Sequence, residues 1–98
     1  MKPVWTALAF DDLRKACDYI AEEKPAAARA LIQKVEEAAL TLGRHPEIGR
    51  PGRARGTREL AIPSTPFILP YRIKDGRIEI LALMHGARRW PNSFPPDF

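Results

Sequence analysis

The segment Phe67–His85, FILPYRIKDGRIEILALMH, decides the fold. Its centre, Asp75-Gly76, is a residue pair that two-residue hairpin turns prefer, because both turn positions need a positive φ. In the residues before that pair, one set of apolar residues occupies every second position, which is the period of a β-strand. We therefore predict two antiparallel strands, the first with Phe67, Leu69, Tyr71 and Ile73 on one face.

Two features qualify this hairpin. Pro70 has no backbone N–H to donate, so the first strand should carry a bulge or leave this position unpaired. The second strand is expected to run from Arg77 to His85, with an apolar face made by Ile78, Ile80, Ala82 and Met84. Leu81 and Leu83 on the other face imply that this face is partly covered as well.

A third strand precedes the hairpin. Leu60 and Ile62 alternate with Glu59 and Ala61, and the sequence PSTP at 63–66 then turns the chain. A short extended start is expected at 2–5. Tyr71 falls on the apolar face of its strand, so we expect a core residue with its hydroxyl hydrogen-bonded.

Between the extended start and this third strand the apolar period changes to that of a helix. Thr6 can cap a first helix that ends near Glu23, and Pro25 can open a second. Gly43 follows the last apolar position, where a glycine cap is expected. The apolar faces are Phe10, Leu13, Cys17 and Ile20 in the first helix, and Ala28, Leu31, Ile32, Val35, Ala38, Ala39 and Leu42 in the second.

These elements give one domain, residues 1–98, of the α+β class. The order is β-α-α-β-β-β: a helical hairpin at about 7–42, a basic loop at 43–58, a three-stranded part at about 58–85 and a C-terminal tail at 86–98. The tail is too rich in proline to continue as strand or helix. An antiparallel sheet with the helical hairpin packed on one face satisfies this order.

Composition excludes several classes of protein. No apolar run approaches the roughly 18 residues of a membrane span, and the N-terminus offers no signal-peptide core. A single cysteine, Cys17, fits a reducing cytoplasm. Histidine and cysteine are too few and too far apart for a metal site, and no phosphate-binding glycine loop is present, so we expect neither metal nor cofactor.

The charge is concentrated in the basic loop. It holds five arginines against one acid, a balance of +4 that equals the formal net charge of the whole chain. Such a patch indicates a polyanionic partner, nucleic acid or an acidic polypeptide, although arginines in a surface loop can also be solvated charge alone. The candidate binding residues of the loop are Arg50, Arg53, Arg55 and Arg58.

A second basic cluster, HGARRWP at 85–91, follows the last strand. His85 is a candidate general base, with a structural residue bonded to nearby backbone as the alternative. Arg88 and Arg89 are candidates for binding phosphate or carboxylate. Trp90, which is also a candidate for binding the target or the antitoxin, is expected to fold back over the core in preference to stacking on a base. Arg72, on the strand face opposite Tyr71, is a further binding candidate.

The ordered motifs VWTALAFDDL (4–13), DYIAEEKPAAARALI (18–32), HPEIGRPGRARGTRELAIPSTPFILPYRI (45–73) and RIEILALMHGARRWP (77–91) resemble the RelE/ParE superfamily of type II toxin–antitoxin toxins. The resemblance implies a toxin that arrests growth, as in plasmid-stabilisation systems, until a ParD-like or RelB-like antitoxin wraps around it. The basic loop and the helical hairpin are the expected contacts. Operator DNA would be bound only through the antitoxin, and no membrane is involved.

The superfamily contains two activities. RelE-like members cut mRNA on the ribosome; here the candidate groups would be His85, Arg58, Arg72, Arg88 and Arg89. ParE-like members poison DNA gyrase. By strand register, the third-strand arginine of several RNA-cutting members corresponds to Ile68, and ARRWP offers no clear equivalent of their C-terminal Tyr or His. The sequence therefore favours a gyrase poison, with a ribosome-dependent endonuclease as the alternative and a non-toxic binding module as the third hypothesis.

Overall fold

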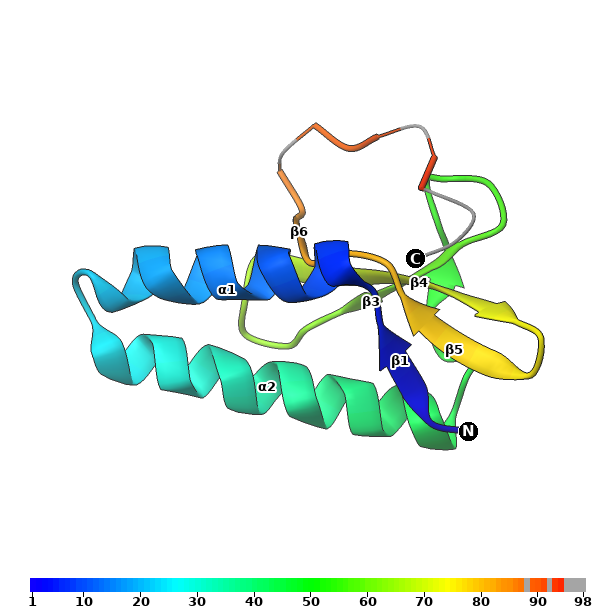
Figure 1. Ribbon diagram of the computed structural model, residues 1–98, viewed down its shortest axis with the longest axis horizontal. Helices are drawn as coiled ribbons and strands as arrows, with labels where there is room; N and C mark the ends of the chain where they lie inside the picture. Colours follow the sequence, from blue (N-terminus) through cyan, green and yellow to red (C-terminus); the bar gives the residue numbers. More distant parts are fainter. Residues whose placement is uncertain (88, 92, 95–98) are drawn as a thin grey trace.

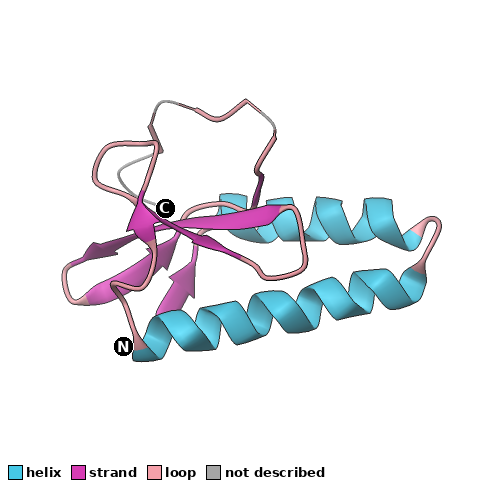
Figure 2. Cartoon of the chain, turned by 180° about the vertical axis from the view of Figure 1, so that it is seen from behind, coloured by secondary structure: helices cyan, strands magenta, loops and turns pink. Residues whose placement is uncertain are grey.

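The computed structural model describes residues 1–98 except 88, 92 and 95–98. Two helices lie side by side along one side of the molecule, and the strands gather against them (Figure 1, Figure 2). The predicted α+β class and element order are confirmed. The elements are β1 (Pro3–Trp5), α1 (Ala7–Ala21), α2 (Pro25–Arg44), β2 (Arg50–Pro51), β3 (Arg58–Ala61), β4 (Phe67–Lys74), β5 (Arg77–Ile80) and β6 (Met84–His85).

The sheet has the strand order β1-β5-β4-β3-β2, and β6 also pairs with β4. It is mixed, because β1 runs parallel to β5 while every other pair is antiparallel. The wholly antiparallel sheet expected from the sequence therefore needs correction at β1. Thr6 explains this edge: its N–H donates to the Ile80 carbonyl at 3.1 Å and its hydroxyl to the Leu81 carbonyl at 3.1 Å.

The strand expected from Arg77 to His85 is interrupted, so that prediction is wrong in its continuity. β5 and β6 are separated by residues 81–83, and the register against β4 shifts by one residue across the gap. The Leu81 N–H donates to the Pro70 carbonyl at 2.9 Å, whereas the Leu83 N–H donates to the Asp12 carboxylate at 3.0 Å. The sequence places a bulge or an unpaired position in the strand of Pro70, and this is wrong in its location: Pro70 pairs with Glu59 of β3, and the extra residue lies in the facing segment 81–83.

The helix starts are as predicted. The Thr6 hydroxyl accepts the Ala9 N–H at 3.1 Å, and Pro25 occupies the first turn of α2. The glycine cap is wrong, because α2 continues through Gly43 to Arg44. A Cβ at Gly43 would lie 2.8 Å from the Met1 carbonyl oxygen, so glycine here permits the first residue to approach the end of α2.

The core lies between the helical hairpin and one face of the sheet, which we call the inner face. It contains Leu31, Val35, Leu42, Leu69, Tyr71, Ile78 and Ile80. Two residues of the predicted apolar stripes lie outside it: Phe10 is 59% exposed and Ile32 is 37% exposed. Phe10 instead stacks on Trp5, with ring centroids 5.5 Å apart. Within the described residues, no helix is long and apolar enough to cross a membrane.

Candidate interaction surface

The basic loop is more ordered than the sequence suggests. Its first two residues complete α2, Arg50–Pro51 form β2, and Arg58 opens β3. Between these strands the Gly52 N–H donates to the Thr57 carbonyl at 2.8 Å, and the Thr57 hydroxyl donates to the Ala54 carbonyl. The prediction of an irregular loop therefore holds only for the residues between these elements.

Tyr71, on the inner face of β4, holds the start of the basic loop through its hydroxyl. Its hydroxyl donates to the Pro46 carbonyl at 2.8 Å and accepts the Gly49 N–H at 2.9 Å, so the expected pairing is confirmed. A Cβ at Gly49 would lie 2.6 Å from the Tyr71 ring, which makes glycine necessary for this approach. Burial raises the pKa of Tyr71, although the Gly49 N–H and the charge of Arg58 oppose the shift.

Arg58 also holds the loop. Its Nη1 donates to the carbonyls of Gly49 at 2.8 Å and Glu47 at 3.2 Å. Backbone carbonyls at a turn have few other donors, and a guanidinium can satisfy two of them at once. Arg58, which the sequence offers as a phosphate ligand, thus has a structural use in this conformation.

Glu59 of β3 receives the hydrogen bonds of the basic loop, and its side chain is only 2% exposed. One carboxylate oxygen accepts from Arg50 Nη2 at 3.1 Å, and the other accepts the Arg53 backbone N–H at 2.7 Å. Arg53 Nε lies 3.8 Å from the first oxygen. A buried carboxylate must be paired in this way to remain stable. In the sequence Glu59 is only a residue that alternates with Leu60 and Ile62 in a strand, and that pattern does not predict its contacts with the basic loop.

Trp90 joins the C-terminal tail to the basic loop. The Arg53 guanidinium carbon lies 3.9 Å from the Trp90 ring centroid, a cation–π contact. The indole N–H donates to the His85 carbonyl at 3.2 Å. Trp90 therefore folds back onto an arginine of the loop, and not over the core as the sequence predicts. Figure 1 shows the coloured residues of the tail on the side of the molecule where the loop lies.

A second buried carboxylate lies on the same outer face of the sheet. Glu79, with a side chain 3% exposed, accepts from Arg72 Nε at 2.6 Å and from Arg77 Nη2 at 3.1 Å. Burial alone would raise the pKa of Glu79, but the two guanidiniums outweigh it and hold the pKa below its ordinary value. Arg72 is itself only 14% exposed and lies against this carboxylate.

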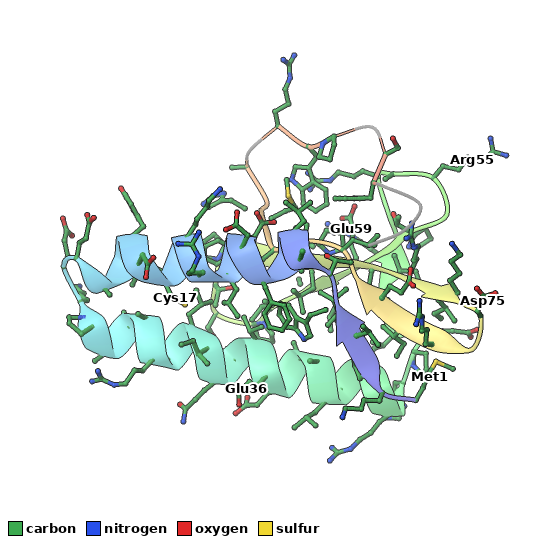
Figure 3. The ribbon with its side chains drawn as sticks, in the orientation of Figure 1. Met1, Cys17, Glu36, Arg55, Glu59 and Asp75 are labelled. Atoms are coloured by element: carbon green, nitrogen blue, oxygen red, sulfur yellow. The ribbon has the colours of Figure 1, made fainter. Side chains whose placement is uncertain are left out.

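Two candidate arginines point outward. Arg55 lies at the tip of the basic loop and projects away from the body of the molecule (Figure 3). Arg89 is exposed in the tail. Within the described part of the chain, neither makes a hydrogen bond or ion pair. Arg88, a third candidate, lies outside the described residues.

His85 lies apart from the arginines. It pairs with Phe67 on β4, its ring meets the Phe67 ring edge-on at 5.8 Å between centroids, and its Nδ1 accepts the Ala87 N–H at 3.1 Å. It lines a cavity of about 500 Å³ together with Asp12, Lys15 and Tyr19 of α1, so it faces the helices. Arg72 faces the opposite side of the sheet.

Arg58 shares the inner face with His85 but not its neighbourhood. Arg58 pairs with Tyr71, whereas His85 pairs with Phe67, four residues away along β4. That separation corresponds to roughly 13 Å along a strand. The structure therefore does not bring His85, Arg58 and Arg72 together around one reacting group. Among the described residues, no cluster of His, Cys, Asp or Glu could hold a metal.

An apolar groove on the helical hairpin was missed by sequence reasoning. It has a volume of about 430 Å³ and lies between β1, α1 and α2. Its lining includes Trp5, Phe10, Leu13, Ile32, Val35 and Leu40. Leu40 is 61% exposed, and with Phe10 it forms an apolar rim that no described segment covers. The available signal was Leu40, an apolar residue outside the buried stripe of its helix.

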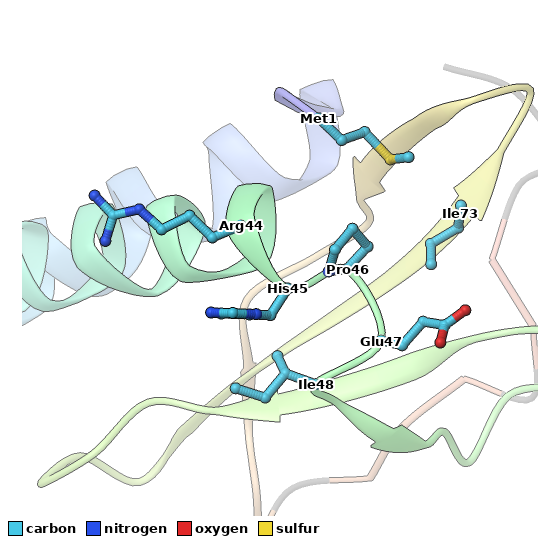
Figure 4. A pocket seen from close by; sticks show the side chains of 7 residues that line it. All are labelled: Met1, Arg44, His45, Pro46, Glu47, Ile48 and Ile73. Carbon is cyan, nitrogen blue, oxygen red and sulfur yellow. The ribbon is translucent and has the colours of Figure 1, made fainter.

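A further hollow, of about 700 Å³, lies beyond the end of α2. Met1, Pro46, Ile48 and Ile73 contribute most of its apolar lining, and Arg44, His45 and Glu47 complete it (Figure 4). It is wide and open, and its polar side chains do not converge on one point. We assign it no chemistry.

Comparison with known proteins gives a consistent group of relatives. A family described as the ParE toxin of type II toxin–antitoxin system, parDE, matches residues 4–90. Y4kP of Sinorhizobium fredii, which carries a provisional designation as a toxin, is 39% identical over 87 residues, covering 89% of this chain and 90% of its own. Toxin RelE2 of Caulobacter vibrioides is 34% identical over 85 residues, covering 87% of this chain and 94% of its own.

Solved structures agree with these matches. A chain of the chromosomal ParDE system of P. aeruginosa superposes with a TM-score of 0.80 at 30% identity, covering 87% of this chain and 95% of its own. A chain of the toxin–antitoxin complex RelBE2 of Mycobacterium tuberculosis gives a TM-score of 0.58 at 28% identity, covering 86% of this chain and 95% of its own. Both neighbours come from toxin–antitoxin systems.

Proposed function

The chain belongs to the ParE toxin family of type II toxin–antitoxin systems, and from that premise we propose that it arrests growth by binding and poisoning DNA gyrase. The observation that carries the proposal is the basic loop, which is held in one conformation and joined to Trp90. A fixed basic surface suits binding, because the cost of ordering the loop is met before the partner arrives. Gyrase acts on DNA in the cytoplasm, where we expect the toxin to act.

The arrangement of the candidate nuclease groups supports the same proposal. Cleavage of RNA without a metal needs a base, an acid and phosphate-binding cations within reach of one phosphate. Here His85 faces α1, while Arg72 lies on the outer face against Glu79. Ile68, at the position of the arginine of several RNA-cutting relatives, is a buried apolar residue.

The cognate antitoxin is the second partner, and we assign it to the apolar groove. Both similar structures come from systems in which a toxin is paired with an antitoxin. An amphipathic helix can place apolar side chains into a groove of this kind. Lys2 and Glu36 at the rim offer polar contacts of either sign. On this assignment, the antitoxin and gyrase bind chemically different surfaces.

A ribosome-dependent mRNA endonuclease is the second candidate, favoured by two relatives. One relative is named RelE2, and one structural neighbour is a RelBE2 complex. On this hypothesis His85 would be the acid or base, working from its cavity with Asp12, Lys15 and Tyr19. Burial raises the pKa of Asp12, although the Leu83 N–H opposes the shift.

A gyrase assay with the purified chain tests the proposal. We expect inhibition of supercoiling and trapped cleaved DNA, both relieved by the cognate antitoxin and both retained by His85→Ala. Ribosome-dependent mRNA cleavage that disappears in His85→Ala, from a chain without effect on gyrase, would replace the proposal with the endonuclease. Healthy cells after expression without the antitoxin would contradict both and leave a non-toxic binding module.

A further inference from the structure

We propose that Glu59 is a positioning residue, which holds the basic loop and the C-terminal tail together as one binding surface for the toxin's target. The inference depends on the proposed function only for the identity of that target. Glu59 itself is buried and cannot contact a macromolecular partner. It acts through Arg53 and Trp90.

The contacts form a continuous path. Glu59 accepts the Arg53 backbone N–H at 2.7 Å, which fixes the position of Arg53 within the loop. The Arg53 guanidinium then lies 3.9 Å from the Trp90 ring centroid, and Trp90 is held in turn by its indole N–H bond to the His85 carbonyl. Arg53 thereby links the Glu59 carboxylate to Trp90, a residue more than 30 positions away in the sequence.

Arg50 extends this arrangement to the sheet edge. It pairs with Glu59 in the register of β2 and β3, and its Nη2 donates to the same carboxylate at 3.1 Å. Its side chain is 61% exposed, so the guanidinium keeps donors free for a partner while Glu59 fixes its direction. β2 is two residues long, too short to be held by backbone pairing alone.

Stability alone does not explain why a carboxylate is buried at position 59. Burying an ion pair is often neutral compared with apolar residues of the same volume, because desolvation offsets the attraction. Glu59 does select one loop conformation, since one carboxylate oxygen accepts from the Arg50 side chain and the other from the Arg53 backbone N–H. The exposed groups this conformation presents are Arg50, Arg55, Arg89 and one side of Trp90, which together fit an anionic partner.

Glu79 provides a matched control. It is also buried on the outer face, and it is also bridged by two arginines, Arg72 and Arg77. Among the described residues it makes no hydrogen bond or ion pair with the basic loop or with Trp90. Glu79→Gln and Glu59→Gln therefore remove the same charge from similar surroundings, and they differ in whether the positioning path is cut.

The first measurement is the indole N–H resonance of Trp90 in the free toxin. The chain has two tryptophans, so the Trp90 signal is the one that disappears in Trp90→Phe. We expect Glu59→Gln to shift or broaden this signal and Glu79→Gln to leave it unchanged. Glu59→Asp, which restores the charge, should return it part of the way. An unmoved Trp90 signal in Glu59→Gln would overturn the proposal.

The second measurement separates positioning from folding. Glu59→Gln should weaken gyrase inhibition on the order of tenfold, as expected for loss of one charge-assisted hydrogen bond, while antitoxin affinity stays within about twofold. A purely structural role would lower both together. If Glu59→Gln does not fold, Arg53→Gln replaces it, with Arg55→Gln as its charge-matched control for the Trp90 signal. Equal target inhibition by wild type and the positioning variant would contradict the proposal.

Growth arrest in cells makes this test independent of gyrase. If the wild-type chain does not inhibit gyrase, the proposed function fails, but the expression level needed for arrest still reports on the true target. We expect Glu59→Gln to need a higher level than Glu79→Gln. Equal levels, with the Trp90 signal displaced, would show that the path exists but does not serve target binding, and would overturn the proposal.

Discussion

The apolar groove and the basic loop are built on opposite principles. The groove is formed by helices and a strand that carry more apolar side chains than the core buries, and Phe10 and Leu40 are the exposed examples. The basic loop has little regular structure and is held by hydrogen bonds to Tyr71, Arg58 and Glu59. A surface of the first kind gains affinity from burial of apolar area, and one of the second kind gains it from charge and preorganisation. The two should therefore respond to different substitutions.

The largest effect is expected in the groove. The double variant Phe10→Asp, Leu40→Asp should weaken antitoxin binding by about 100-fold or more, since central apolar anchors often contribute 2 kcal/mol or more each. Both side chains are well exposed, so the fold should tolerate the change. Calorimetry with the cognate antitoxin measures the loss. Tyr19→Asp, at a residue 77% exposed on the same hairpin, is the control. Retained affinity in the double variant would remove the groove from the antitoxin interface.

The next effect is expected in the basic surface. Arg55→Glu with Arg89→Glu should reduce gyrase inhibition by roughly tenfold to 100-fold and leave antitoxin affinity unchanged, because each reversal affects an exposed charge that the fold does not use. The loss should be greatest at low salt, where surface charges are least screened. Arg29→Glu is the control, because it reverses the charge of an exposed arginine on α2, outside the basic surface. The double variant changes the net charge by four units and Arg29→Glu by two, so a control loss of about half the free-energy change would indicate a net-charge effect only.

Tyr71→Phe tests the base of the loop. Removing the hydroxyl leaves the Gly49 N–H without its acceptor and the Pro46 carbonyl without this donor. An unsatisfied buried group typically costs about 1–3 kcal/mol, so we expect a loss of that size in the free energy of unfolding. Chemical denaturation measures it. Target inhibition should fall more than antitoxin affinity; the reverse order would show that the loop base supports the groove instead.

Much of this fold follows from the sequence pattern. The Asp75-Gly76 turn is confirmed, with φ of 52° and 75°, and so is the Thr6 cap. These depend on the chemistry of one or two residues. The parallel pairing of β1 could not be predicted, because alternation identifies a strand without identifying its neighbour.

The candidate surface was harder to predict. A count of arginines locates the basic loop but does not distinguish arginines that point outward from those that hold the structure. Arg58 binds carbonyls and Arg53 lies over Trp90, and both arrangements depend on contacts between distant segments. The sequence pattern identifies Glu59 only as a strand residue, because its contacts with the basic loop form when the loop folds over it. Partners of this kind become visible only in three dimensions.

The smallest effect concerns Glu79, the carboxylate that the proposed surface does not use. Its pKa is lower in the folded chain than its ordinary value of 4.5, because Arg72 and Arg77 outweigh the effect of burial. Its contribution to stability is therefore present above about pH 4.5 and is lost as the pH falls through the lower, folded pKa.

Glu79→Gln should flatten the acid limb of the unfolding free energy in this range, measured by denaturation at successive pH values. Arg77→Gln should flatten it less, because Arg72 remains at 2.6 Å. An unchanged acid limb in Glu79→Gln would mean that this carboxylate is not a source of acid sensitivity. Its use as the matched control for Glu59 would then depend on burial and geometry alone. A flattened acid limb with unchanged target inhibition in Glu79→Gln would instead show that Glu79 stabilises the sheet, in contrast to Glu59, which positions the basic loop.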